Sequence, residues 1–211
     1  MKRLLVICGV QKDFFELPFG NPRAREILPK IASFVRDWQD DIIVVKETRL
    51  TRELVEMGNG TIPDAKPWED TREAFVWGYA KHCIKWSDGW EIEPEILAEL
   101  QKKNDRKCTF RTVEAYGQTW HDWANNIATY DQIVVCGTKL EDQIISTVFA
   151  ILAVRPNVNV FVQQNLCCSD WHSDALYVWK VLEGKVNLTF YVKEMKDTKD
   201  LTGIEHEVNR K

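Results

Sequence analysis

The sequence predicts a single three-layer α/β/α domain built on a mostly parallel central sheet. Short apolar runs rich in Val and Ile alternate along the chain with segments whose apolar residues recur at helical spacing. Strands that alternate with helices favour a parallel sheet covered on both faces by right-handed crossovers. With 211 residues, of which 45% are hydrophobic, the chain is long enough to bury one substantial core.

Five apolar runs predict the strands, because β-branched residues fit a buried pleated surface. The first, Leu4 to Ile7, follows Lys2 and Arg3 and faintly mimics a secretion signal, but it is too short, and Lys12 and Asp13 interrupt it. We therefore interpret it as a buried strand. The five predicted strands are residues 3–8, 41–46, 131–136, 157–162 and 187–192.

Apolar residues at spacings of three and four predict helices between these strands. One example is the series Ile144, Val148, Ile151 and Leu152. The predicted helices are residues 23–38, 94–103, 117–130, 139–154 and 170–182.

Two stretches break the alternation. Residues 50–89 show no clean period and contain several Gly, Pro and Trp residues, which is typical of a long loop that acts as a lid or pocket wall. Residues 193–211 form a polar tail that we expect to be solvated. We therefore expect one domain over residues 1–192, with the tail outside it.

Composition excludes several classes of function. A net charge of -4 and a pI near 5.7 give no reason to expect nucleic acid as a partner, and no segment suggests a membrane. The six cysteines lack the spacing of a zinc site, and several lie in apolar runs, where a reduced cysteine acts as a small hydrophobe. These features predict a cytoplasmic protein.

Four segments, in order along the chain, resemble motifs of the isochorismatase-like family of cysteine hydrolases, and in particular its nicotinamidase branch. Each motif is weak alone, but the ordered set, together with a segment from Lys107 to Phe110, extends the resemblance over roughly residues 3 to 192. The resemblance implies a Rossmann-like hydrolase fold and frequent oligomerisation. The matching segments are Leu4 to Phe14, Asp41 to Arg49, His82 to Gly89 and Ile133 to Ile144.

The chain departs from this family at the residues that would carry the chemistry. The resemblance implies a thiolate at a helix start, an aspartate that moves its proton, and a lysine. Gly9 stands where the aspartate is expected and Gln143 where the cysteine is expected, whereas Lys107 matches the lysine. A shift of one residue would instead select Arg106.

Another cysteine is a poor substitute for the missing nucleophile. Successive strand residues face opposite sides of a sheet, so Cys8 should point away from a pocket that position 9 lines. Cys136, Cys167 and Cys168 follow or end strands, and we expect them to be inert buried thiols.

The resemblance also implies a metal site, and here again the chain differs. Glu47 stands in place of an aspartate, Arg49 in place of a histidine, and only His82 matches a ligand type. Because arginine is a permanent cation, we expect Arg49 to pair with Glu47 and the site to hold no metal. No other cofactor is predicted.

The ring-binding side of the family pocket has counterparts in this chain. The resemblance places Phe14 and Tyr79 on either side of a flat ring, with Lys139 and Gln143 nearby; plain core packing is the alternative for the aromatics. Without a carboxylate at position 9, Lys107 lacks a counter-charge unless Glu141 or Asp142 turns inward. We therefore expect a small ligand that is a ring-bearing anion.

Three functions follow from these observations. The first is a protein that has lost cysteine-hydrolase activity and binds a small metabolite as a regulatory pseudoenzyme. The second is a hydrolase of altered mechanism that acts on a nicotinamide- or isochorismate-like substrate. The third is a structural subunit that partners an active paralogue. We also expect a homo-oligomer, for which the tryptophan-rich loops would supply interface anchors.

Overall fold

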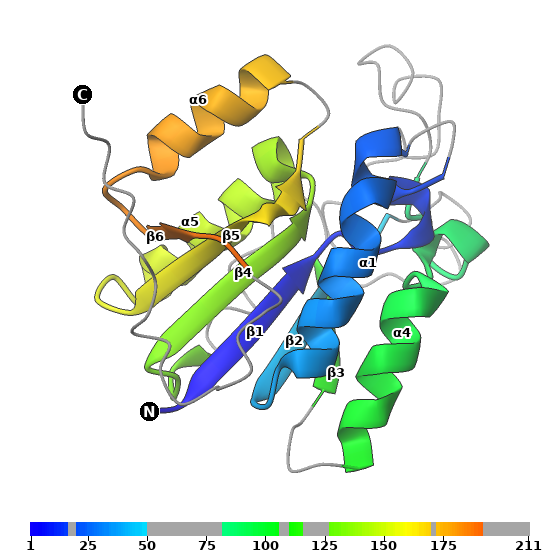
Figure 1. Ribbon diagram of the computed structural model, residues 1–211, viewed down its shortest axis with the longest axis horizontal. Helices are drawn as coiled ribbons and strands as arrows, with labels where there is room; N and C mark the ends of the chain where they lie inside the picture. Colours follow the sequence, from blue (N-terminus) through cyan, green and yellow to red (C-terminus); the bar gives the residue numbers. More distant parts are fainter. Residues whose placement is uncertain (17–19, 50–81, 106–109, 116–126, 170–171, 192–211) are drawn as a thin grey trace, which may run out of the picture.

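Six parallel strands form the central sheet of the computed structural model, in the order β3-β2-β1-β4-β5-β6, and all the arrows in Figure 1 point the same way. The structure describes residues 1–16, 20–49, 82–105, 110–115, 127–169 and 172–191. The strands are β1 (Arg3–Cys8), β2 (Asp41–Glu47), β3 (Phe110–Ala115), β4 (Gln132–Thr138), β5 (Asn159–Cys168) and β6 (Asn187–Thr189).

Helices cover both faces of this sheet. On one face, α1 (Pro22–Asp37) and α4 (Pro94–Gln101) lie side by side (Figure 1) and bury their apolar sides in a core shared with alternate residues of β1 and β2. On the other face, α5 (Ile145–Val154) and α6 (His172–Leu182) share a second core with the intervening strand residues. The sheet is thus the middle of three layers.

Local sequence explains where α1 begins. Asn21 caps the helix, because its side-chain oxygen accepts a hydrogen bond from the backbone N–H of Arg23 at 2.9 Å. Pro22 occupies the first turn, where its missing N–H costs nothing.

Short turns connect the main elements, at the carboxyl ends of the strands except for η4, which follows α4 and precedes β3. They are the 3-10 turns η1 (Lys12–Phe14), η3 (Asp88–Trp90) and η4 (Lys102–Asp105), and a π-helical turn, η6 (Leu140–Ile144), that leads directly into α5. β4 ends at a cis peptide bond between Thr138 and Lys139.

The described chain confirms the predicted α/β architecture and corrects some boundaries. Every described strand is parallel to its neighbours, and β5 continues to Cys168, six residues beyond the predicted end. The edge strand β3 was not among the five predicted strands. Within the predicted helix 117–130, residues 127–130 form a turn, and most of the rest lies outside the described residues.

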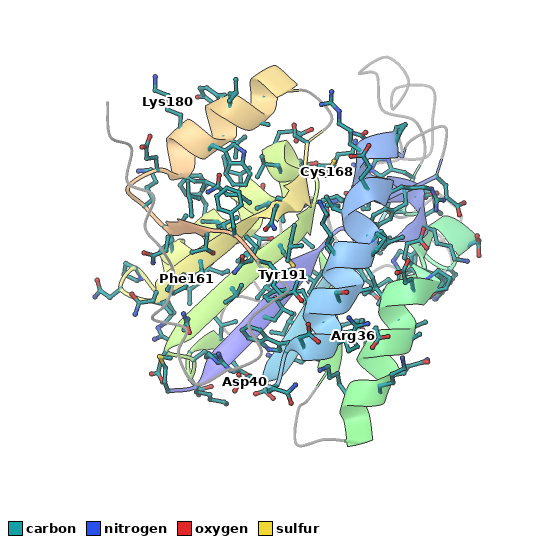
Figure 2. All side chains as sticks on the ribbon, in the orientation of Figure 1. Arg36, Asp40, Phe161, Cys168, Lys180 and Tyr191 are labelled. Atoms are coloured by element: carbon teal, nitrogen blue, oxygen red, sulfur yellow. The ribbon has the colours of Figure 1, made fainter. Side chains whose placement is uncertain are left out.

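The end of the described chain returns to α1. Asn165 of β5 exchanges two hydrogen bonds with the backbone of Tyr191, at 2.7 and 2.9 Å. The hydroxyl of Tyr191, which is labelled in Figure 2, donates to Asp37 at 2.7 Å. The Tyr191 ring packs against Phe34. Residues 50–81 of the predicted lid and the predicted tail lie outside the described residues. In the described part of the chain, none of the helices combines the length and hydropathy that a membrane crossing requires.

Candidate functional site

The candidate site lies where the strand order reverses. The chain runs from β1 outward to β2 and β3 on one side, and from β4 to β6 on the other, so β1 and β4 flank the switch point. Ligands in open parallel sheets bind beyond the carboxyl ends of the strands at this point. Gly9 follows β1, Glu47 ends β2, and Gln143 lies in the turn after β4. The structure therefore brings together three residues that are far apart in sequence.

The buried carboxylate of Glu47 is the centre of this site. Its Oε1 accepts hydrogen bonds from Arg49 Nε at 2.7 Å and from His82 Nε2 at 3.0 Å. Its Oε2 accepts one from Gln143 Nε2 at 2.5 Å. An ionised carboxylate only accepts hydrogen bonds, so His82 Nε2 carries a proton and the Gln143 amide turns its NH₂ towards Glu47. The ion pair expected between Arg49 and Glu47 is thus present.

These donors determine the ionisation of Glu47. The side chain is only 5% exposed, and burial alone raises the pKa of its carboxyl. The hydrogen bond and charge of His82, together with the charge of Arg49, outweigh burial and lower the pKa from 4.5 to about 2. Glu47 is therefore ionised throughout the physiological range and is a weak base.

Gly9 and Gln143 fit each other closely. Gln143 is fully buried, and its Oε1 has no hydrogen-bond partner among the described residues. A Cβ added to Gly9 would lie 2.3 Å from that Oε1 and 2.0 Å from the carbonyl oxygen of Thr138. Gly9 also has a φ of +55°, in the left-handed region that favours glycine. The side chain of Gln143 therefore fills space that any side chain at position 9 would need.

Two residues of the first motif hold the surrounding segment in place. Gln11 Nε2 donates to the backbone oxygens of Glu47 at 2.8 Å and Trp90 at 3.0 Å. Asp13 Oδ2 accepts from the backbone N–H of Cys83 at 2.6 Å. Cys83 has a φ of +51°, which is unusual for a residue with a side chain, and this bond helps to hold it. The sequence placed Gln11 and Asp13 in a motif but did not predict these positioning roles.

A second buried charge lies on the opposite face of β2. Lys46 is buried, and its ammonium nitrogen lies 3.0 Å from the centre of the Trp90 ring and 3.9 Å from Glu91 Oε2. Burial lowers the pKa of Lys46, and the Glu91 carboxylate acts in the opposite direction. Because alternate strand residues face opposite sides, Lys46 points away from the Glu47 cluster. Nothing in the local pattern of residues distinguishes Lys46 from a surface lysine.

The buried cysteines have the properties of core residues. Cys8 packs in the core beneath α5, and its thiol donates to Thr147 Oγ1 at 3.3 Å. Burial raises the pKa of the Cys8 thiol to about 12, against the effect of this hydrogen bond. Burial also raises the pKa values of Cys83 and Cys136 well above the ordinary range. A thiol that stays protonated is a poor nucleophile.

Other residues predicted for the site are less fully placed. Phe14 is buried and contacts His82 edge to face, with ring centres 5.9 Å apart. Lys139 immediately precedes the π-helical turn that carries Gln143. Lys107, its alternative Arg106, and Tyr79 lie outside the described residues. Their roles, and the pocket roles of Phe14 and Lys139, stay predictions.

Comparison with solved structures gives the fold. A nicotinamidase/pyrazinamidase from Bacillus subtilis superposes with a TM-score of 0.66 at 14% identity, over 89% of this chain and 99% of that one. The chain has the isochorismatase-like hydrolase fold. The pyrazinamidase of Pyrococcus horikoshii in complex with zinc gives a TM-score of 0.61 at 14% identity, over 90% and 100% of the two chains.

An amidase of different substrate shares the same fold. The N-carbamoylsarcosine amidase of Thermoplasma acidophilum gives a TM-score of 0.59 at 17% identity, over 90% of this chain and 96% of that one. No protein-family model and no curated protein sequence matches the chain. The predicted nicotinamidase-like architecture is thus confirmed at the level of structure.

The zinc of the Pyrococcus structure raises the question of whether Glu47, Arg49 and His82 could hold a metal ion. They do not fit one: a guanidinium donates hydrogen bonds and cannot coordinate a cation. Both Glu47 oxygens and His82 Nε2 are already engaged within the cluster. Among the described residues, no group of three His, Cys, Asp or Glu side chains is arranged to hold a metal.

Proposed function

We propose that this protein binds a small flat-ring metabolite on the isochorismatase-like hydrolase fold and does not hydrolyse it by cysteine chemistry. One observation carries the proposal. Gln143 lies in the turn after β4, and its buried side-chain amide donates a hydrogen bond to Glu47 and packs against Gly9. An amide side chain is not a nucleophile, and glycine has no group to move a proton. The two positions that the family resemblance assigns to chemistry therefore serve packing and hydrogen bonding here.

The preference for an anionic ligand is the finer part of the proposal. It depends on Lys107, which the family register places near the helix start, where backbone amides favour negative charge. Within the described residues, Arg49 is already paired with Glu47. Burial and the nearby Glu47 carboxylate raise the pKa of the Asp142 carboxyl, whereas Arg49, Lys139 and His82 lower it, so Asp142 belongs to the electrostatic surroundings of the cluster.

Ligand binding is tested by thermal unfolding with nicotinate, nicotinamide and benzoate at millimolar concentration. A ligand that binds only the native protein raises the melting temperature. We expect nicotinate to raise it more than nicotinamide does, and Lys107→Ala to abolish the difference. An equal effect of the acid and the amide contradicts the anion preference alone. No shift with any of the three compounds contradicts the metabolite-binding proposal.

Catalysis is tested separately by ammonia release from nicotinamide at high protein concentration, with the Bacillus subtilis nicotinamidase as positive control. We expect no release above background. Turnover by this chain would contradict the proposed loss of activity. Re-creating the family residues by Gly9→Asp with Gln143→Cys is a poor control, because a side chain at position 9 also meets the Thr138 carbonyl.

One observation favours a second candidate, a hydrolase of altered mechanism. His82 Nε2 donates to Glu47 at 3.0 Å, an arrangement in which a carboxylate orients an imidazole that can act as a general base. If the chain does release ammonia, this candidate predicts that His82→Gln abolishes the activity while the protein stays folded. Retention of activity in that variant contradicts the second candidate.

A further inference from the structure

The Glu47 cluster contains a cation of its own, Arg49. Arg49 lies two residues beyond Glu47, and its side chain is 25% exposed, whereas those of Glu47 and His82 are 7% and 2% exposed. The guanidinium therefore closes the outer side of the carboxylate, and His82 closes the inner side. Gln143 satisfies the remaining oxygen.

We propose that Arg49 is a tethered cation that replaces a divalent metal ion at this site and makes the protein independent of metal. Arginine remains charged at all physiological pH values. A buried carboxylate needs one compensating charge, and Arg49 supplies it without a bound ion. A divalent ion would place two further positive charges beside the guanidinium, which repels them.

The backbone fixes Arg49 at this position. Its N–H donates to the Cys83 carbonyl at 3.0 Å, and its carbonyl accepts from Lys85 N–H at 2.8 Å. These bonds form a parallel bridge between Arg49 and Ile84, next to His82. Residue 49 is thus attached both to Glu47, through β2, and to the segment that carries His82. A shorter side chain at position 49 would stay beside both.

This geometry predicts that one substitution creates a metal site. Arg49→His would place a second imidazole beside Glu47 and His82, giving two nitrogen donors and one carboxylate, a donor set that zinc accepts with one position left open. The inference concerns the cation alone and stands whether or not the pocket binds a ring or hydrolyses it.

The test is zinc content and thermal stability of the full chain, measured for wild type, Arg49→His and the matched double variant Arg49→His/His82→Ala. Each protein is equilibrated with zinc, dialysed and analysed by elemental mass spectrometry. We expect wild type to retain no zinc and to melt at the same temperature with zinc or a chelator. Arg49→His should retain about one equivalent, and its melting temperature should rise with zinc concentration. The double variant should lose both effects.

Two results would overturn the proposal. The first is wild-type protein that retains zinc and loses it on Glu47→Gln, because Arg49 would then not exclude the ion. The second is a folded Arg49→His variant that retains no zinc, because residue 49 would then not occupy the cation position. If Arg49→His does not fold, zinc retention by the wild type and its loss on Glu47→Gln still decide whether Arg49 excludes the ion.

Discussion

Replacing Glu47 with Gln removes the one charge around which the site is organised. The variant amide would present an NH₂ group to donors that need acceptors, and would leave the Arg49 charge without its partner. The magnitude follows from the pKa of the carboxyl, which falls from 4.5 to about 2 on folding. Since each pKa unit corresponds to about 1.4 kcal/mol, the ionised carboxylate contributes about 3 kcal/mol of stability at pH 7.

The stabilisation by Glu47 should decrease as the pH falls. The folded-state pKa of Glu47 lies below its unfolded-state value, so the contribution is complete above about pH 5 and is lost as the pH falls towards 2. At pH 3.5 it should be about 2 kcal/mol. The stability difference between wild type and Glu47→Gln should therefore be about 3 kcal/mol at pH 7 and clearly smaller at pH 3.5. Contributions from other carboxylates cancel in this difference.

Urea unfolding followed by tryptophan fluorescence measures the two free energies of unfolding at each pH. The matched control is Glu16→Gln, which removes a carboxylate that lies 3.6 Å from Arg25; the two side chains are 51% and 52% exposed. Surface pairs of this kind contribute less than about 1 kcal/mol. The reasoning fails if Glu47→Gln costs no more than the control, or if its cost does not decrease at pH 3.5.

Three further predictions concern packing around the site. Gly9→Ala should lower the free energy of unfolding by at least about 2 kcal/mol, because the new Cβ meets backbone atoms. The control Gly184→Ala, also at positive φ but with open space around it, should cost only about 1 kcal/mol. Equal costs in urea titrations would contradict the close fit at Gly9. Cys8 and Cys136 should resist iodoacetamide at pH 8 in the native protein, because their raised pKa values keep the thiols protonated, and they should react after unfolding. Peptide mass spectrometry follows the labelling, and rapid labelling of the native protein would contradict the burial of these thiols. Asp13→Ala should destabilise the folded protein by about 1–3 kcal/mol, because the hydrogen bond from the Cys83 N–H is lost. Thermal unfolding measures the change, and an unchanged melting temperature would show that this hydrogen bond is not needed.

Much of the architecture could be predicted from local patterns, because β-branched runs and helical spacing report burial directly. The run Leu4 to Ile7 gave β1, and the spacing of Val148 and Ile151 gave α5. β3 was missed because its residues, Phe110 to Ala115, include Arg111 and Glu114, as an edge strand permits. β5 was cut short because Gln163 to Asn165 are polar, yet they continue the strand.

The site was predictable only as a set of positions. The pairing of Arg49 with Glu47 follows from two opposite charges near one strand end, and the structure has it. The bond between Gln143 and Glu47 spans 96 residues, and no local pattern carries it. No local pattern predicts the hydrogen bonds from Gln11 to the backbone of Glu47 and Trp90 either. Such contacts depend on how separate loops pack against each other in the tertiary structure.

The close fit of Gly9 against Gln143 also limits the order in which these residues can change. A side chain introduced first at position 9 collides with both the Gln143 amide and the Thr138 carbonyl. If position 143 is shortened first, the amide obstacle disappears, and the Thr138 carbonyl at the end of β4 and the positive φ at position 9 remain. Any mutational route from this chain to one with an acid at position 9, in the laboratory or in nature, is therefore easier when it begins at position 143. A single substitution at position 9 therefore stays unfavourable as long as Gln143 is in place.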